Sequence, residues 1–299
     1  MRYATAVFSL LMGLAIAPLA HTASPFLLPD QFDIDSDTIT LQSGITNDKF
    51  FVPSRHFATD FLITNPKHQA STAVAAANFK RFSMVEIAIP DTGTYRIQTQ
   101  NSATTTTDYA LIDGRWLRIR PAKKAPDSPK MTAAKPDDSK APAKTEPAKV
   151  EPPRSIVLAD VPATAERRSS TIQQRADTYV SKGVPTALLH QPESGFVVRP
   201  ITHPNEVFAG DDLELLVLND GQPVADLTLD VLLGANAFDR DAKREQPSVK
   251  TDANGKVKIH LERTGVYLIA TRYPAMNRDL TVAPPSHVTQ YGLTLEVAP

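Results

Sequence analysis

The sequence predicts an all-β protein with two immunoglobulin-like β-sandwich domains joined by a disordered linker rich in Lys, Ala and Pro. Two observations carry this prediction. Apolar and polar residues alternate over short segments separated by turn dipeptides, as strands with one buried face require. In addition, one proline-rich interval separates an N-terminal block, residues 21–120, from a C-terminal block, residues 191–299.

The C-terminal block shows the clearest alternation. Two of its alternating segments flank Asp220-Gly221, which favours a hairpin turn because glycine tolerates a positive φ. The segment from Lys250 to Arg272 repeats this arrangement with Asn254-Gly255. Short strands with such turns are typical of a β-sandwich. The residues expected to face inward are Leu213, Leu215, Val217, Leu227, Leu229, Val231, Val257, Ile259, Leu261, Leu293, Leu295 and Val297.

The N-terminal block alternates in the same way and contains a partial copy of the C-terminal pattern. Sixteen residues from Val85 align without gaps with sixteen residues from Val257, and seven positions are identical. Both segments contain Thr-Gly-x-Tyr, which places Tyr95 and Tyr267 like the corner tyrosine of an immunoglobulin-like sandwich. We interpret the match as duplication of a sandwich. The alternative is that turn-and-strand patterning alone produced it.

Residues 121–154 form the predicted linker. Eight of the 25 prolines lie in these 34 residues, with seven alanines, seven lysines and no aromatic residue. Such a segment buries too little apolar surface to offset its ordering entropy, about 1–2 kcal/mol per residue for the backbone. We therefore expect an extended, disordered tether. Residues 155–190 are predicted to connect it to the C-terminal domain and to return to the N-terminal domain as a strand, with a helix over 163–176 as the alternative.

Residues 1–20 predict export. Arg2 precedes an uncharged, mostly apolar run from Ala6 to Ala17, and a short tail ends in Ala20. This is the layout of a secretory signal peptide, since the apolar run is too short to cross a bilayer of about 30 Å comfortably; an uncleaved anchor is the alternative. No later segment has 18 consecutive apolar residues. We therefore expect a periplasmic protein with no stable membrane span after cleavage.

Composition excludes several classes of protein. The chain has no cysteine, so disulfide scaffolds, cysteine-ligated metal sites and thiol enzymes are excluded. A net charge of −1 gives no reason to expect nucleic acid as a partner. The sequence also lacks the phosphate-binding, nucleophile-elbow and helical zinc motifs GxxxxGK[ST], GxSxG and HExxH. We therefore predict that the protein is not an enzyme.

The seven histidines are the remaining candidate metal ligands, and no two of them are three or four residues apart. Cleavage after Ala20 would make His21 the mature N-terminus, where its α-amine and imidazole can together chelate Cu²⁺, Ni²⁺ or Zn²⁺. The second candidate ligand is His203, in a loop where Pro204 and Asn205 indicate an ordered turn. The alternatives are a solvated histidine at a frayed terminus and a turn-stabilising hydrogen bond, respectively.

An ordered set of motifs covers nearly the whole mature chain except the tether. It begins with a signal peptide that ends in Ala20-His21. Together the motifs resemble a bacterial periplasmic family of unknown function labelled "nickel uptake substrate-specific transmembrane region". The other motifs are Phe26-Leu27-Leu28-Pro29, Thr46-Asn47-Asp48-Lys49-Phe50-Phe51, Gly93-Thr94-Tyr95-Arg96-Ile97, residues 178–186, Ile201-Thr202-His203-Pro204-Asn205, Ala209-Gly210-Asp211, Asp220-Gly221-Gln222-Pro223, residues 251–255 and residues 293–297.

The resemblance implies an exported two-domain β protein associated with metal uptake through a TonB-dependent receptor or an inner-membrane transporter. It also implies a histidine directly after the cleavage site, and His21 matches that position. Two features depart from the family pattern. Residues 22–25 make a longer spacer than expected before the first apolar residues, and the Lys/Ala/Pro tether looks like an addition.

Two functions follow as hypotheses. The first is a non-enzymatic periplasmic accessory that binds or delivers a transition-metal ion (nickel, cobalt, copper or zinc), with His21 and His203 as metal ligands. The alternative is a non-catalytic structural or protein-interaction module of the cell envelope. The tether favours this alternative, because it would let two sandwiches reach different partners.

Overall fold

The computed structural model describes residues 23–47, 52–57, 60–100, 104–121, 153–188, 194–234, 245–275 and 277–299. The predicted signal peptide, His21 and residues 122–152 of the predicted linker lie outside this part. Strands dominate the described residues, whose single helical element is a 3₁₀ turn, Leu158–Asp160. The all-β prediction is therefore confirmed.

The described residues contain twenty strands. The first ten are β1 (Ser24–Pro29), β2 (Asp33–Ile34), β3 (Thr38–Thr46), β4 (Asp60–Thr64), β5 (Ala70–Val74), β6 (Ala77–Asn78), β7 (Phe82–Ala88), β8 (Gly93–Thr99), β9 (Thr104–Ile112) and β10 (Arg115–Arg120). The next ten are β11 (Ser155–Val157), β12 (Arg167–Lys182), β13 (Phe196–Pro200), β14 (Asp211–Asn219), β15 (Gln222–Pro223), β16 (Thr228–Leu233), β17 (Glu245–Lys250), β18 (Lys256–Leu261), β19 (Gly265–Tyr273) and β20 (His287–Val297).

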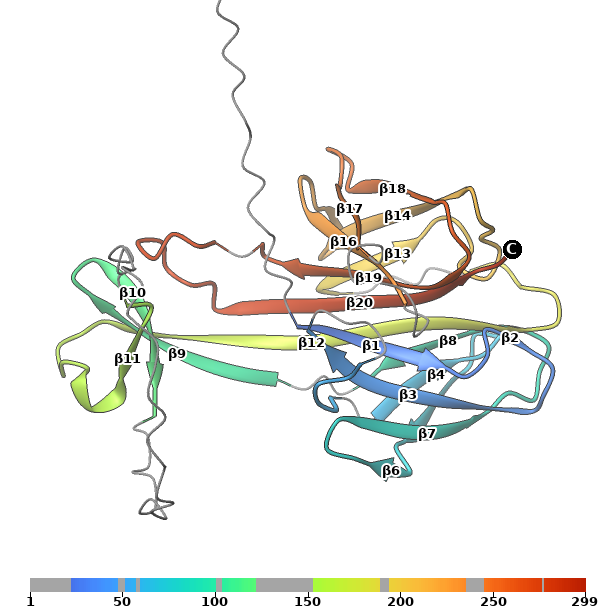
Figure 1. Ribbon diagram of the computed structural model, residues 1–299, viewed down its shortest axis with the longest axis horizontal. Helices are drawn as coiled ribbons and strands as arrows, with labels where there is room; N and C mark the ends of the chain where they lie inside the picture. Colours follow the sequence, from blue (N-terminus) through green and yellow to red (C-terminus); the bar gives the residue numbers. More distant parts are fainter. Residues whose placement is uncertain are drawn as a thin grey trace, which may run out of the picture.

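These strands form three sheets that pack as sandwiches. A large sheet of 12 strands runs in the order β11-β10-β9-β12-β20-β19-β16-β17, with β2, β4, β5 and β8 attached beside this path. The first small sheet has the order β1-β3-β7-β6, and the second contains β13, β14, β15 and β18. In Figure 1 the small sheets lie on opposite sides of the long strands β12 and β20. The large sheet is therefore common to both halves of the molecule.

Two main cores lie between the large sheet and the small sheets. Every residue that the C-terminal alternation places inward is buried, with exposed fractions of at most 5%. The N-terminal core contains the corresponding alternating residues of the first block, among them Ile39, Leu41, Phe61 and Ile97. Period-two alternation thus predicted both sets of buried side chains correctly.

Strand β12 belongs to both cores. Its residues Ala176 and Val180 pack in the N-terminal core, whereas Tyr179 packs in the C-terminal core. Successive side chains of a strand point to opposite faces, so both faces of this stretch are covered. Along its edges β12 pairs antiparallel with β8 and β9 and parallel with β20. Of the two alternatives that the sequence left open here, the structure has the strand.

The strands that flank the predicted linker lie side by side in the large sheet. The strands at its two ends, β10 and β11, pair in parallel with each other, from Arg118 opposite Ser155 to Arg120 opposite Val157. The interval therefore leaves and re-enters the sheet at one place. The described strands of the two halves are hydrogen-bonded into one sheet through β12 and β20, so two separate domains with a linker between them are not confirmed.

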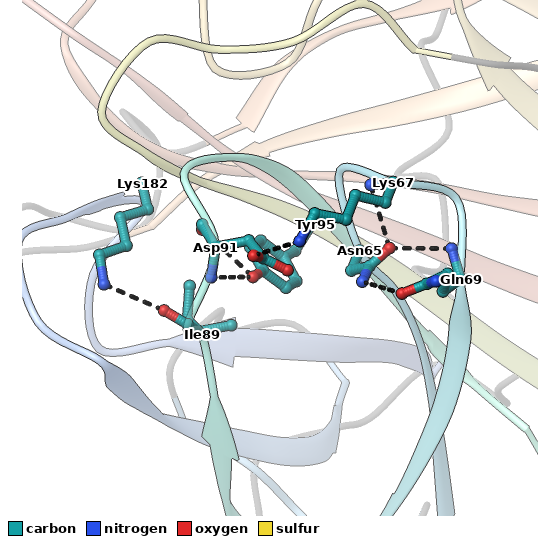
Figure 2. Close-up of polar contacts among 7 residues, drawn as sticks. All are labelled: Asn65, Lys67, Gln69, Ile89, Asp91, Tyr95 and Lys182. Atoms are coloured by element: carbon teal, nitrogen blue, oxygen red, sulfur yellow. Dashed lines mark hydrogen bonds and ion pairs between the residues drawn. The ribbon is translucent and has the colours of Figure 1, made fainter.

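The two tyrosine corners are confirmed. The Tyr95 hydroxyl donates to the carbonyl oxygen of Asp91 at 3.2 Å and accepts from the Asp91 amide at 2.8 Å (Figure 2). The Tyr267 hydroxyl donates to the carbonyl oxygen of Arg263 at 2.9 Å. At each corner the chain passes from a small sheet to the large one, from β7 to β8 and from β18 to β19. The sequence repeat therefore corresponds to the same structural step in both halves.

The two predicted hairpin turns have different outcomes. Asp220 and Gly221 have φ values of 48° and 76°, and Asn219 pairs with Gln222, as in a two-residue hairpin with both central residues at positive φ. Asn254-Gly255 also lies in a turn, but β17 and β18 belong to different sheets. The second turn is thus a crossover between the layers of the sandwich, because each flanking strand pairs with another partner.

Gly292 provides a test of the contact between β1 and β20. A Cβ atom there would lie 1.9 Å from the carbonyl oxygen of Pro25. Gly292→Ala should therefore destabilise the protein by about 3 kcal/mol, at the upper end of overpacking effects, in urea unfolding. Gly44→Ala is the control. A Cβ atom at Gly44 would meet only side-chain atoms, the nearest at 3.0 Å, so this substitution should lower the free energy of unfolding by less. Equal losses would contradict the close approach of β1 to β20.

Candidate functional site at the seam between the cores

His203 lies where the two halves meet. It belongs to the loop between β13 and β14, and it is half-buried against the end of β12 and the start of β8. Its Nε2 atom is 3.0 Å from the carbonyl oxygen of Thr186 and 3.1 Å from the hydroxyl of Thr94. Its Nδ1 atom accepts a hydrogen bond of 3.1 Å from the Asn205 amide. Both ring nitrogens are therefore engaged.

These partners assign the proton of His203. The Asn205 amide can only donate, so Nδ1 must accept, and the carbonyl of Thr186 can only accept, so Nε2 must carry the proton. Burial lowers the pKa of His203, while Glu206 and the hydrogen bond to the Thr186 carbonyl act in the opposite direction. The ring is thus held neutral in one tautomer. The turn-stabilising hydrogen bond that the sequence left as an alternative is present.

A directed chain of hydrogen bonds continues from this histidine. The Thr94 hydroxyl oxygen accepts from the Thr186 amide at 2.9 Å. The same hydroxyl donates its own proton to the Ser181 hydroxyl oxygen, also at 2.9 Å. Ser181 donates to the side-chain oxygen of Asn205 at 3.1 Å, and the Asn205 side-chain amide donates to the carbonyl of Tyr179 at 3.1 Å. The chain ties β8, β12 and the His203 loop together. We call this boundary between the two cores the seam.

Arg96 and Asp177 form a second polar contact in the same seam. The guanidinium donates to the carboxylate at 2.6 Å, and the Asp177 side chain is 2% exposed. Arg96 also lies 5.9 Å from the centroid of the Tyr179 ring. Nearby, burial raises the pKa of Tyr291 well above its usual range, and Asp177 raises it further. The seam is therefore a buried polar layer between two apolar cores.

A surface pocket opens beside this layer. Its volume is about 210 Å³, and its walls come from the start of β2, the end of β12, the His203 loop and the end of β20. Ser181 and Asn205 form one wall, so the hydrogen-bonded chain supports the pocket from behind. Its charged lining residues are Asp33 and Glu296. Partial burial raises the pKa of Glu296, and the nearby charge of Asp33 raises it further.

The hydrogen bonds of the seam fix which of its groups carry protons. Thr94 and His203 are placed like a nucleophile and its base, but Nε2 carries a proton and therefore cannot accept the one from Thr94. The hydroxyl of Ser181 is directed at Asn205. Within the part of the chain that the structure describes, the seam offers a shaped acidic pocket rather than an activated nucleophile.

The structure describes only one of the two predicted metal ligands. His21 lies outside the described residues. His203 is described, but its two nitrogens are hydrogen-bonded, and the described residues contain no cluster of three or more His, Asp or Glu side chains suited to a metal ion. Ligation by His203 stays a prediction that would require the ring to leave the Thr186 carbonyl or the Asn205 amide.

Sequence reasoning missed Asp33 and Glu296 as site residues. Asp33 opens the run Asp33-x-Asp35-x-Asp37, which fails as a calcium loop because Thr38 and Gly44 replace the required glycine and glutamate. Glu296 is one of the polar residues of the last alternating strand. The two are distant in sequence, so no local pattern could have paired them.

Comparison with known proteins identifies the family. The family described as "Domain of unknown function (DUF4198)" matches residues 19–275. The chain belongs to this family. The match supports the sequence-based resemblance to a family of unknown function, whereas the nickel-uptake label gains no support from it. No curated protein matches this DUF4198 chain. No helix in its described residues is long and apolar enough to span a membrane.

Several solved structures resemble the DUF4198 chain only loosely. The D0-D1 domain of intimin matches at 11% identity, covering 91% of this chain and 97% of that one, with a TM-score of 0.23. The Escherichia coli adhesin FdeC matches at 12% identity, with 94% and 65% covered and a TM-score of 0.20. The FN1-FN3 domains of chicken CNTN1 match at 8%, with 92% and 99% covered and a TM-score of 0.21. Such TM-scores carry no argument about function.

The neutral state of His203 predicts a pH dependence of stability. Its folded pKa lies below the unfolded value of about 6.5, so the unfolded chain binds more protons as the pH falls through that value. The stability that His203 contributes is therefore present above about pH 6.5 and is lost on acidification. Thermal unfolding between about pH 7.5 and about pH 5.5 should show a steeper loss for the wild type than for His203→Gln. Parallel curves would contradict a lowered pKa.

The metal hypothesis has a direct test. Isothermal titration of the processed protein beginning at His21 with Ni²⁺, Cu²⁺, Zn²⁺ and Co²⁺ should detect binding that His21→Ala weakens at least ten-fold, since the α-amine and imidazole act together. His203→Gln tests the second predicted ligand: weaker binding assigns His203 to the metal site, and unchanged binding removes it from the hypothesis. Absence of binding tighter than about 1 mM in the wild type would rule the hypothesis out.

Proposed function

We propose that this protein is a non-catalytic interaction module of the cell envelope that contacts a partner protein through a projecting arm. The arm consists of β9, β10, β11 and residues 167–173 of β12. In Figure 1 it extends to the left, away from the stacked sheets. The observation that carries the proposal is a group of exposed arginines on this arm that have no acidic partner in the described structure.

The arm is a folded element rather than a loose extension. Trp116 and Leu117 are buried at 6% and 7% exposed, and Ala110 is fully buried. The Arg168 guanidinium lies 5.6 Å from the centroid of the Trp116 ring. The Trp116 amide also donates to the carbonyl of Leu280 at 2.7 Å, which ties the arm to the β19–β20 connection. A partner would therefore meet a surface of fixed shape.

The composition of the arm suits a protein interface. Arg118 and Arg168 both lie opposite Tyr109, on either side of it in the sheet, and their side chains are exposed. Arg120 lies opposite Val157, which is 38% exposed, and the adjacent Leu158 is 51% exposed. Arginine and aromatic residues are enriched in interfaces, where they supply most of the binding energy. This pattern favours a partner with an acidic surface.

The carboxylates of the arm do not neutralise its exposed arginines, so the positive charge stays available to a partner. The acidic residues of the arm and of the turns next to its strands are Asp108, Asp113, Asp160 and Glu166, all exposed. Asp108 accepts from the Ser169 hydroxyl at 2.6 Å rather than from an arginine. Placement in the envelope rests on the predicted signal peptide. The protonated Nε2 of His203, which cannot serve Thr94 as a base, supports a non-catalytic role.

Site-specific crosslinking in cells tests the proposal. A photo-reactive residue at Leu158 should give a discrete adduct with one envelope protein, because this side chain sits at the arginine-rich surface. The same residue at Ile201, which is 46% exposed but belongs to the C-terminal half, is the matched control and should give none. Arg118→Glu with Arg120→Glu should reduce the Leu158 adduct several-fold. Identical adducts at both positions, or none at Leu158, would contradict the proposal.

A further inference from the structure

The pocket beside the seam plays no part in the proposed contact through the arm. Its size and lining indicate what it could bind. Its volume of about 210 Å³ is smaller than the roughly 300–1,000 Å³ typical of sites for drug-sized ligands. Its apolar lining includes Phe32 and Val207, which are 5% and 2% exposed, and Phe208, which is 51% exposed at the mouth. A space of this size suits one side chain or a small organic ion.

The charge of the pocket is uncompensated. Asp33 and Glu296 are its lining carboxylates, and no lysine, arginine or histidine lines it. In the described structure neither carboxylate has a hydrogen-bond or ion-pair partner. The two interact unfavourably, since Asp33 adds to the effect of burial in raising the pKa of Glu296. A bound positive charge would relieve this repulsion.

The remaining polar lining groups already have partners. Asn205 uses its side-chain oxygen to accept from Ser181 and its side-chain nitrogen to donate to Tyr179. Each of these two groups is already held by a hydrogen bond within the protein. Two carboxylates fall short of the six to eight oxygens that Ca²⁺ takes, and the lining provides no nitrogen ligand for Ni²⁺, Cu²⁺ or Zn²⁺. The apolar walls suit an organic cation instead.

We propose that this pocket binds an alkylammonium group: a positively charged amine on a short aliphatic stem. The ammonium lies between Asp33 and Glu296, the stem contacts Val207 and Phe32, and the exposed ring of Phe208 offers its face to the cation. The same chemistry is presented by a lysine side chain of a protein and by a free small amine. The site is separate from the arm, so it holds whether or not the arm binds a partner.

Ligand titration monitored by thermal shift and calorimetry tests this site in the full mature chain. The probes are n-butylammonium and a short lysine peptide, each compared with a neutral counterpart, n-butanol or the same peptide with acetylated lysine. Saturable binding of at least one charged probe, with no binding of its neutral counterpart, is expected. A peptide that binds at least ten-fold tighter than butylammonium identifies a protein side chain as the ligand; the reverse order identifies a free amine.

Three variants locate the binding. Glu296→Gln and Asp33→Asn should each weaken it at least ten-fold, whereas Asp35→Asn should not, because Asp35 is exposed like the two pocket carboxylates but lies outside the pocket. Glu296→Gln should fold at neutral pH with stability at least equal to the wild type, since it removes a carboxylate whose pKa burial raises. Equal binding of neutral probes, binding unaffected by both pocket variants, or a Ca²⁺ response that depends on Asp33 and exceeds the amine response would overturn the proposal.

Discussion

The architecture depends on one strand with two buried faces. β12 contributes Val180 to one core and Tyr179 to the other, while its edges bond to β8 and β9 on one side and to β20 on the other. A strand in this position cannot be withdrawn from one core without exposing the other. We therefore expect the two halves to unfold together, in contrast with domains that pack through a small polar interface and move independently.

The polar sequence of β12 follows from this position. Gln174 donates to Gln290 at 2.9 Å, Thr178 donates to the carbonyl of Thr294 at 3.0 Å, and Asp177 accepts from Arg96. Each bond crosses to a neighbouring strand, so a shift of β12 by one residue would break all three. Burying an ion pair such as Arg96–Asp177 costs several kcal/mol per ion, and the cost is offset only when the geometry is correct. The polar layer thus selects one register where apolar packing alone would tolerate others.

Sequence reasoning recovered what is local and missed what is assembled by the fold. Alternation identified Leu213, Ile259 and the other core residues, because burial of one face imposes a period of two. It also identified Tyr95 and Tyr267, whose hydroxyls bond four residues upstream. For β12 it favoured a strand but gave neither its bounds nor its place in both cores, because a strand with two buried faces lacks alternation. Sequence reasoning could not pair Asp33 with Glu296 either. The two residues come from opposite ends of the chain, and they are close only because β2 and β20 meet at one pocket.

The parallel pairing of β10 with β11 has a consequence for how the chain can vary. Because Arg120 lies opposite Val157, the Lys/Ala/Pro-rich interval is closed at its base by hydrogen bonds between its own flanking strands. The entropy of closing a loop grows only with the logarithm of its length, about 0.6 kcal/mol for each doubling. Residues can therefore be gained or lost between these strands while β10, β11 and both cores keep their places. We therefore expect the protein to tolerate changes in the length of this interval.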